Sequence, residues 1–461
     1  MSGDLKVAGK ALAAACQELR EGGAADAVGD GVVPGYVASP ADTGEAAALL
    51  RAAAEHELAV VPRGSGSRLG WGVPPDRCDL LVDTRRMDAV VEHAAGDLVA
   101  KVQAGALMNH VLGVLGAAGQ EIALDVPGTA TVGGVVASGL CGPRRLRYGS
   151  PRDLLIGITI VRADGTVAHS GGKVVKNVAG YDLGKLFAGS AGTLGLITEA
   201  TFRLHPLPAA RAFVTVTFPA GAAAADVAAV VALAANSPLV ASAVELHRPG
   251  VAGPASVGVL VEGSADGVAA RAARLADLLG VAVGPGGSGS GAAEVSVSGE
   301  PPSWWAGAIE AGDGTLVRVS FWVSALGGVL DAIDAAARDA GAAPLVYGSA
   351  GAGVLYLDCG AEPGVAAGFV GALRGTSHGV LRGASGQARG GVVVLAAPRA
   401  VRSALAAHGG MAGTVLPSPV GTHQPASPVG THQPALGVMR AVKDQFDPGR
   451  RMAPGRFPEG I

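Results

Sequence analysis

Residues 127–139 read Pro-Gly-Thr-Ala-Thr-Val-Gly-Gly-Val-Val-Ala-Ser-Gly. Thr131 is of a type that caps helices, and the amides at a helix N-terminus point toward an anion such as phosphate. Gly133 and Gly134 allow another group to approach the backbone closely, and the small residues at 137–139 leave room for a flat ring. The stretch therefore predicts an anion-binding turn, although a purely structural turn explains the same residues equally well.

A second glycine-rich stretch stands upstream, at residues 61–72, and reads Val-Pro-Arg-Gly-Ser-Gly-Ser-Arg-Leu-Gly-Trp-Gly. Glycines that follow a buried strand let successive N–H groups converge on an anion. The loop adds hydroxyl donors and positive charge, from Ser65, Ser67, Arg63 and Arg68. Its G-x-G-x-x-x-G spacing is not that of a Rossmann turn, and Pro74-Pro75 prevent the helix that such a turn requires. A tight structural loop stays open as the alternative.

A third stretch, at residues 189–198, reads Gly-Ser-Ala-Gly-Thr-Leu-Gly-Leu-Ile-Thr. It is predicted to join a short helix to a strand at 197–204, where apolar and polar residues alternate. Its backbone could then lie along the edge of a bound heterocycle. A structural turn is again an equal alternative for this stretch taken alone.

Taken in order, the three stretches resemble the FAD-binding domain of the vanillyl-alcohol oxidase and p-cresol methylhydroxylase superfamily. More narrowly, Ser-Gly-Leu-Cys-Gly-Pro-Arg-Arg at 138–145 and Lys-Asn-Val-Ala-Gly-Tyr-Asp-Leu at 176–183 resemble the FAD-binding subunit of glycolate oxidase. The resemblance covers residues 36–208 and, more weakly, the tail at 446–456. It implies an α+β fold, in which a two-subdomain FAD-binding domain is followed by an α+β cap lobe with an antiparallel sheet.

The resemblance also implies a cofactor site. The first stretch would hold the FAD pyrophosphate through its amides, the second would reach the pyrophosphate and ribityl chain, and the third would offer backbone groups to the pyrimidine edge of the flavin. The residues assigned in this way are Arg63, Gly64, Ser65, Gly66, Ser67, Pro127, Gly128, Thr129, Thr131, Gly133, Gly134, Ser138, Gly192 and Ile197. Relatives with covalently bound flavin often carry a histidine in the first loop. None is present here, so we expect noncovalent FAD.

The resemblance, together with the pattern of apolar runs, implies four segments. These are an N-terminal helical segment at 1–35, the FAD-binding domain at 36–208, a cap lobe at 209–410 and a C-terminal segment at 411–461. The prolines at 206 and 208 mark the main boundary. Residues 285–302 are rich in glycine and serine and are predicted to be a linker. A nine-residue unit is repeated in tandem at 418–435, which we interpret as a slippage duplication in an exposed loop.

The residues that would carry out chemistry beside the flavin cannot be named from the sequence. Hydroxy-acid-oxidising relatives carry an H-x-G-D-G-N-x-H run for a metal and a base, and nothing here matches it. His378 and His408 have no acidic neighbour and are interpreted as core or surface residues, so no metal site is predicted. The arginines at 144, 145 and 147 could clamp a substrate carboxylate, but a solvated loop or a partner contact is the favoured interpretation. Trp304-Trp305 are interpreted as core residues.

The missing run favours a subunit that shares electrons with a second flavoprotein subunit and an iron–sulfur subunit during oxidation of a small 2-hydroxy acid. A self-sufficient FAD-dependent dehydrogenase is the alternative. The net charge of −3 and dispersed basic residues argue against nucleic acid as a partner. The four isolated cysteines match neither a zinc site nor an iron–sulfur motif and suit the cytoplasm. The composition shows no membrane span or signal segment, and docking of a complex on the inner face of a membrane stays open.

Overall fold

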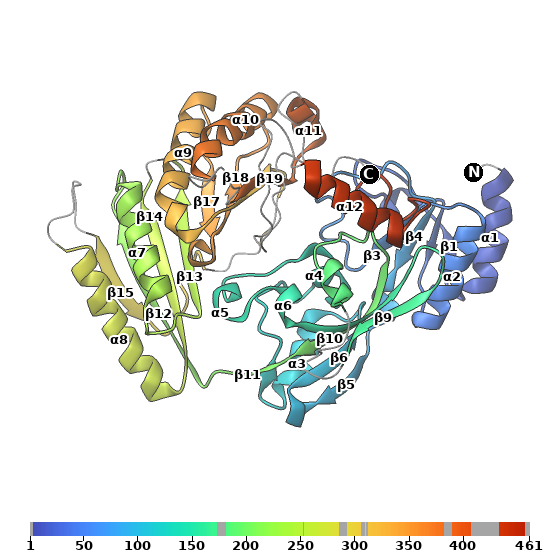
Figure 1. The fold of residues 1–461 in the computed structure, drawn as a ribbon, viewed down its shortest axis with the longest axis horizontal. Helices are drawn as coiled ribbons and strands as arrows, with labels where there is room; N and C mark the ends of the chain where they lie inside the picture. Colours follow the sequence, from blue (N-terminus) through green and yellow to red (C-terminus); the bar gives the residue numbers. More distant parts are fainter. Residues whose placement is uncertain are drawn as a thin grey trace. The chain divides into compact units, whose positions relative to one another are not determined.

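The structure is a computed structural model, and it describes residues 3–172, 181–251, 253–284, 293–305, 309, 312–381, 390–406 and 433–456. Two compact units are present (Figure 1). The first comprises Met1–Cys141, Gly149–Leu207 and Leu436–Ile461, and the second comprises Gly142–Tyr148 and Pro208–Ala435. Residues 142–148 thus group with the second unit, although the sequence predicted an unbroken segment at 36–208. The four-segment division stays a prediction.

The first unit contains a small sheet with two helices beside it. Its strand order is β1-β2-β4-β3, and β2, β4 and β3 are parallel. The bounds are β1 Leu19–Glu21, β2 Tyr36–Ala38, β3 Val60–Arg63, β4 Leu80–Asp83, α1 Gly3–Ala15 and α2 Thr43–Glu55. Asp42 caps α2 by accepting the Glu45 amide at 2.8 Å. β3 is an edge strand of this sheet and leads directly into the first glycine-rich stretch.

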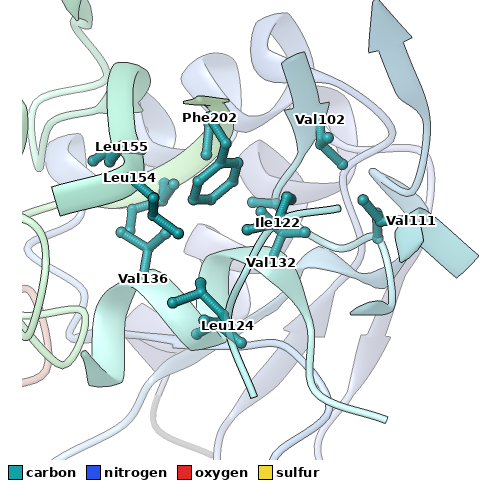
Figure 2. Packing of buried hydrophobic residues seen from close by; sticks show 14 of the residues in the cluster. Val102, Val111, Ile122, Leu124, Val132, Val136, Leu154, Leu155 and Phe202 are labelled. Carbon is teal, nitrogen blue, oxygen red and sulfur yellow. The ribbon is translucent and has the colours of Figure 1, made fainter. Parts of the chain in front are cut away.

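A second, antiparallel sheet of the same unit has the order β5-β6-β10-β8-β9. Its bounds are β5 Val90–Ala94, β6 Val99–Gln103, β8 Leu155–Val161, β9 Val167–Gly171 and β10 Leu196–Arg203; β7 Gln120–Glu121 pairs separately with β11 His205–Pro206. α3 Met108–Gly116, α4 Val132–Ser138 and α6 Pro151–Leu154 lie in the same part of the chain. Alternating side chains of the strands meet apolar helix residues, and Figure 2 shows Val102, Val111, Val132, Val136 and Phe202 in this core. Burying each such side chain contributes about 1.5–3 kcal/mol.

The second unit is built on one eight-stranded antiparallel sheet of order β15-β12-β14-β13-β17-β18-β16-β19. This confirms the predicted α+β lobe with an antiparallel sheet. The strands are β12 Ala210–Phe218, β13 Ala243–Pro249, β14 Ala255–Gly263, β15 Glu294–Ser298, β16 Leu316–Ser320, β17 Leu345–Gly348, β18 Val354–Asp358 and β19 Gly391–Ala396. The helices are α5 Arg145–Tyr148, α7 Ala224–Asn236, α8 Ala265–Ala282, α9 Leu326–Ala340, α10 Pro363–Val380 and α11 Arg399–Leu405.

The predicted linker at 285–302 is wrong in one part. Residues 294–298 form β15, which pairs with β12 from Phe213↔Ser298 to Thr217↔Glu294. Most of this edge strand is exposed, so its sequence, Glu-Val-Ser-Val-Ser, shows little of the hydrophobic signal that marks a buried strand. Residues 285–292 lie outside the described part of the chain.

Of the C-terminal segment, Leu436–Ile461 belong to the first unit. α12 Gln433–Phe446, drawn in red in Figure 1, is followed by a tail that reaches β3. The Val60 amide donates to Arg451 O at 2.8 Å, and the Ala453 amide donates to Val60 O at 2.7 Å. The tail therefore covers part of the free edge of β3.

Candidate cofactor site

The three glycine-rich stretches lie together in the first unit. A Cβ atom added to Gly64 would lie 2.0 Å from Thr131 Oγ1, so the first stretch touches the second. A Cβ atom added to Gly192 would lie 3.2 Å from Pro62 Cγ, so the third stretch touches the first. Glycine backbone of one stretch is thus packed against a side chain of another, at points where a larger residue would crowd its neighbour.

The second and third stretches are joined by hydrogen bonds. The Gly189 amide donates to Val136 O at 2.9 Å, and the Ala191 amide donates to Ala137 O at 2.7 Å. Both acceptors lie in α4, so the helix carries the third stretch on its C-terminal turn. Ala191 itself has a φ of 52°, a left-handed conformation that is uncommon outside glycine.

The first stretch contains backbone amides that are available to bind a ligand. Within the described chain, no hydrogen bond to protein runs from the amides of Ser65, Gly66 or Ser67. Gly66 has a φ of 82°, and the Ser65 and Ser67 hydroxyls lie 3.5 Å apart in exposed positions. Unpaired amides around a left-handed glycine are what an anion-binding nest requires. The loop therefore suits the predicted contact with the phosphates.

The side chain of Arg63 is already engaged. It pairs with Asp83 at 2.9 Å and with Asp26 at 3.4 Å and is 13% exposed. Burial alone would raise the pKa of Asp83, but hydrogen bonds from Arg85 and Arg63 outweigh burial and hold that pKa below its usual value. Arg63 thus braces the edge of the small sheet, and its predicted amide contact with FAD stays a prediction.

Thr131 caps α4 as predicted, with its Oγ1 accepting the Gly134 amide at 3.3 Å. The other amides of the first turn are also bonded inside the protein: Val132 donates to Ala106 O at 2.9 Å and Gly133 to Ala104 O at 2.7 Å. The predicted cofactor contacts of Thr131, Gly133 and Gly134 stay predictions, and these amides could serve them only by giving up bonds to protein. Gly133 has a packing reason of its own, because a Cβ there would lie 2.8 Å from Ala104 Cβ.

The flanks of the second stretch form turns. The Ala130 amide donates to Pro127 O at 2.9 Å, which leaves the intervening Thr129 side chain exposed. Gly128 packs on α3, where a Cβ would lie 3.1 Å from Asn109 Cβ. Ser138 donates its hydroxyl to Gly134 O at 2.7 Å.

The third stretch contains a feature that sequence reasoning did not single out. Ser190 is 8% exposed, and its Oγ has no hydrogen-bond partner among the described residues. Because a buried hydroxyl without a partner is costly, this orphaned group fits a ligand that completes the site. No local pattern marks it, since the same residue would also suit a turn.

Ile197 lies where β10 has one strand partner. It pairs with Ile160 of β8, in a ladder that has a bulge between Ile197 and Glu199, whereas pairing with β6 starts only at Glu199. One backbone edge at Ile197 therefore has no strand beside it. This register suits the predicted contact with the pyrimidine edge of a flavin, although the Ile197 side chain is in the core.

The other sequence candidates belong to the second unit or lie outside the described chain. Arg144 is 6% exposed and pairs with Glu262 at 3.6 Å, and Arg147 donates to Ser242 Oγ at 3.3 Å. Trp305 packs edge-on against Phe213, with ring centroids 5.1 Å apart, in agreement with a core role. Residues 173–180, the ring of His378, His408 and nearly all of the tandem repeat are not described. Within the described residues, no group of three metal-ligating side chains occurs.

Fold and site together define a class of protein. Residues 34–171 match the family model described as "FAD binding domain". The fold matches that of p-cresol methylhydroxylase with substrate bound, with a TM-score of 0.69 and 14% identity over 99% of this chain and 97% of that one. Residues 34–171 are therefore an FAD-binding domain, in a chain with the p-cresol methylhydroxylase-type fold. The predicted p-cresol methylhydroxylase-type fold and the predicted FAD cofactor are confirmed.

Among individual proteins, the chain is 37% identical over 178 residues to glycolate oxidase subunit GlcD of Bacillus subtilis, a match that covers 38% of each chain. It is 38% identical over 154 residues to glycolate oxidase subunit GlcE of Escherichia coli, covering 33% of this chain and 43% of that one. It is 35% identical over 188 residues to a D-lactate dehydrogenase of Archaeoglobus fulgidus, covering 40% and 41%. The matched region thus spans less than half the length of each relative. Among the described helices, none is long and apolar enough to cross a membrane.

Proposed function

We propose that this chain is the FAD-binding subunit of a glycolate oxidase-like complex, in which it takes part in the oxidation of a small 2-hydroxy acid. The observation that carries the proposal is the convergence of the three glycine-rich stretches at Gly64, Thr131 and Gly192. Similarity to two differently named glycolate oxidase subunits supports it.

The residues around the convergence suit FAD. The unpaired amides of Ser65, Gly66 and Ser67 would hold the pyrophosphate, the orphaned Ser190 hydroxyl would gain a partner, and the open edge at Ile197 would meet the flavin. FAD, when bound, supplies the hydride-accepting chemistry. The protein would orient the cofactor and would bind its phosphates through backbone N–H groups.

We propose that the FAD is held noncovalently, because the first stretch contains no histidine. Precipitating the yellow protein with acid tests this. The flavin should appear in the supernatant, and flavin that stays in the pellet would contradict the proposal.

The complex would include a second flavoprotein subunit and an iron–sulfur subunit, since the chain's own cysteines stand alone in the sequence. It would be cytoplasmic or attached peripherally to the inner face of the membrane through the complex. Affinity purification of the full chain from its native cells should bring down both subunits together. Recovery of the chain alone, with full activity, would contradict this arrangement.

The alternative is a self-sufficient 2-hydroxy-acid dehydrogenase, which similarity to D-lactate dehydrogenases favours. Mixing the isolated chain with glycolate or D-lactate without oxygen separates the two. As a subunit dependent on its partners, the chain should show little bleaching of the flavin spectrum within minutes. Rapid bleaching by the isolated chain would establish the alternative instead.

A further inference from the structure

Two cations of the C-terminal segment, the buried Lys443 and the partly buried Arg456, donate hydrogen bonds to backbone carbonyls of the glycine-rich stretches. We propose that Lys443 and Arg456 are positioning residues, which fix the third and the first stretch and thereby set the affinity for FAD without contacting it. The inference rests on the proposed binding of FAD at these stretches.

Lys443, near the end of α12, has an exposed fraction of 0%. Its Nζ donates to Thr193 O at 2.7 Å, to Asp447 Oδ2 at 2.7 Å and to Met452 O at 2.9 Å. All three ammonium donors are therefore used, and one of them ends on the third stretch. Burial lowers the pKa of Lys443, and the Asp447 carboxylate partly offsets that effect.

Asp447 completes this buried group. Its carboxylate also accepts the Arg451 amide at 3.0 Å and the Met452 amide at 2.8 Å. A charged pair with no exposure is retained only when further hydrogen bonds satisfy it, and here the tail supplies them. The turn after α12 is thus locked to the lysine that holds Thr193.

Arg456 acts on the first stretch. Its Nη1 donates to Leu69 O at 2.7 Å and its Nη2 to Trp71 O at 2.8 Å. Burial lowers the pKa of Arg456 to about 10, so the side chain is still charged at neutral pH. No carboxylate shares it in a described ion pair, and both bonded groups are loop carbonyls.

The placement has an energetic reason. Glycine-rich loops lose more conformational entropy on ordering than other loops. A loop that is already ordered binds its ligand without that cost at the moment of binding. Removing an anchor should therefore weaken FAD binding even where no FAD contact is lost.

The test is Arg456→Met compared with Arg451→Met in the full chain. Arg451 donates to Ala163 O at 2.8 Å, which lies outside the three stretches, so it is a matched tail anchor. Titrating FAD into the stripped protein should show a Kd raised about tenfold in Arg456→Met, equivalent to about 1.4 kcal/mol, and one within about twofold of wild type in Arg451→Met. Arg456→Lys, which can restore one bond, should lie between.

Lys443→Met combined with Asp447→Asn tests the other anchor without leaving a buried unpaired charge. Its effect on the Kd should multiply with that of Arg456→Met, because the two act on different stretches. Equal Kd values in Arg456→Met and wild type, or an equal rise in Arg451→Met, would overturn the inference. Melting temperatures of the stripped variants distinguish a merely structural role, which would lower them and leave the Kd unchanged. A wild-type chain that takes up no FAD would instead defeat the proposed function itself.

Discussion

At the scale of single residues, the site depends on Gly64, whose missing side chain leaves room for Thr131. An alanine there would place its Cβ 2.0 Å from Thr131 Oγ1. We expect Gly64→Ala to destabilise the fold by about 1–3 kcal/mol through overpacking and to abolish retention of FAD on gel filtration. Gly70→Ala is the control, because Gly70 lies in the same stretch with nothing within 4 Å of its Cβ position. If Gly64→Ala retains FAD, then close packing of Gly64 against Thr131 is not required for FAD binding.

Ser190 gives a sharper test at the same scale, since its orphaned hydroxyl contributes nothing to the stripped protein. Ser190→Ala should leave the melting temperature of the stripped protein equal or higher, because a buried group without a partner is removed. It should raise the Kd for FAD about tenfold, as expected when one hydrogen bond of about 1.4 kcal/mol is lost. A lower melting temperature with an unchanged Kd would show that the hydroxyl serves the protein and not the cofactor.

At the scale of elements, the C-terminal ends of β3 and β4 depend on carboxylates held by Arg63. Hydrogen bonds from Arg20 hold the pKa of Asp26 well below its usual range, and the pKa of Asp83 is also lowered. A lowered folded-state pKa gives stability that is present above the unfolded value of about 3.9 and is lost as pH falls through the folded value.

The free energy of unfolding should therefore decline below about pH 4 in the wild type. Asp83→Asn should be less stable at neutral pH and should show a flatter decline. Asp444→Asn is the control, because its ion pair with Arg450 is half exposed and worth little. Urea unfolding at a series of pH values measures all three, and parallel curves for Asp83→Asn and wild type would contradict the assignment.

The same scale shows what the sequence could and could not predict. The bounds of α9 can be predicted from the sequence, because apolar residues recur at helical spacing and Gly341, with a φ of 65°, ends the helix. β15 was missed because edge pairing leaves little hydrophobic signal. The order of glycine-rich stretches indicated the cofactor, but the role of Gly133 in packing on Ala104 depends on a neighbour that no local pattern reveals. The hydrogen bond from Arg456 to Leu69 joins residues that are 387 positions apart, so no periodic pattern in the sequence can predict it.

At the scale of the whole molecule, the four tryptophans divide between the units. Trp71 lies within the first stretch, in the first unit, whereas Trp304, Trp305 and Trp322 lie in the second unit. A chain with the latter three changed to phenylalanine therefore reports on the first unit alone. FAD at about 100 times its Kd should quench Trp71 and add about 2.7 kcal/mol to the unfolding free energy that Trp71 reports. An unchanged Trp71 transition would place the cofactor elsewhere.

The closing of β3 by the C-terminal tail has a consequence for biosynthesis. During translation, β3 and the first and third glycine-rich stretches leave the ribosome long before residues 443–456, which contact them. N-terminal domains generally fold while synthesis continues, yet the contact between Lys443 and Thr193 can form only after 250 further residues have been made. If Lys443 and Arg456 anchor the stretches as proposed, a ribosome stalled before Lys443 would display an incomplete site that binds FAD weakly.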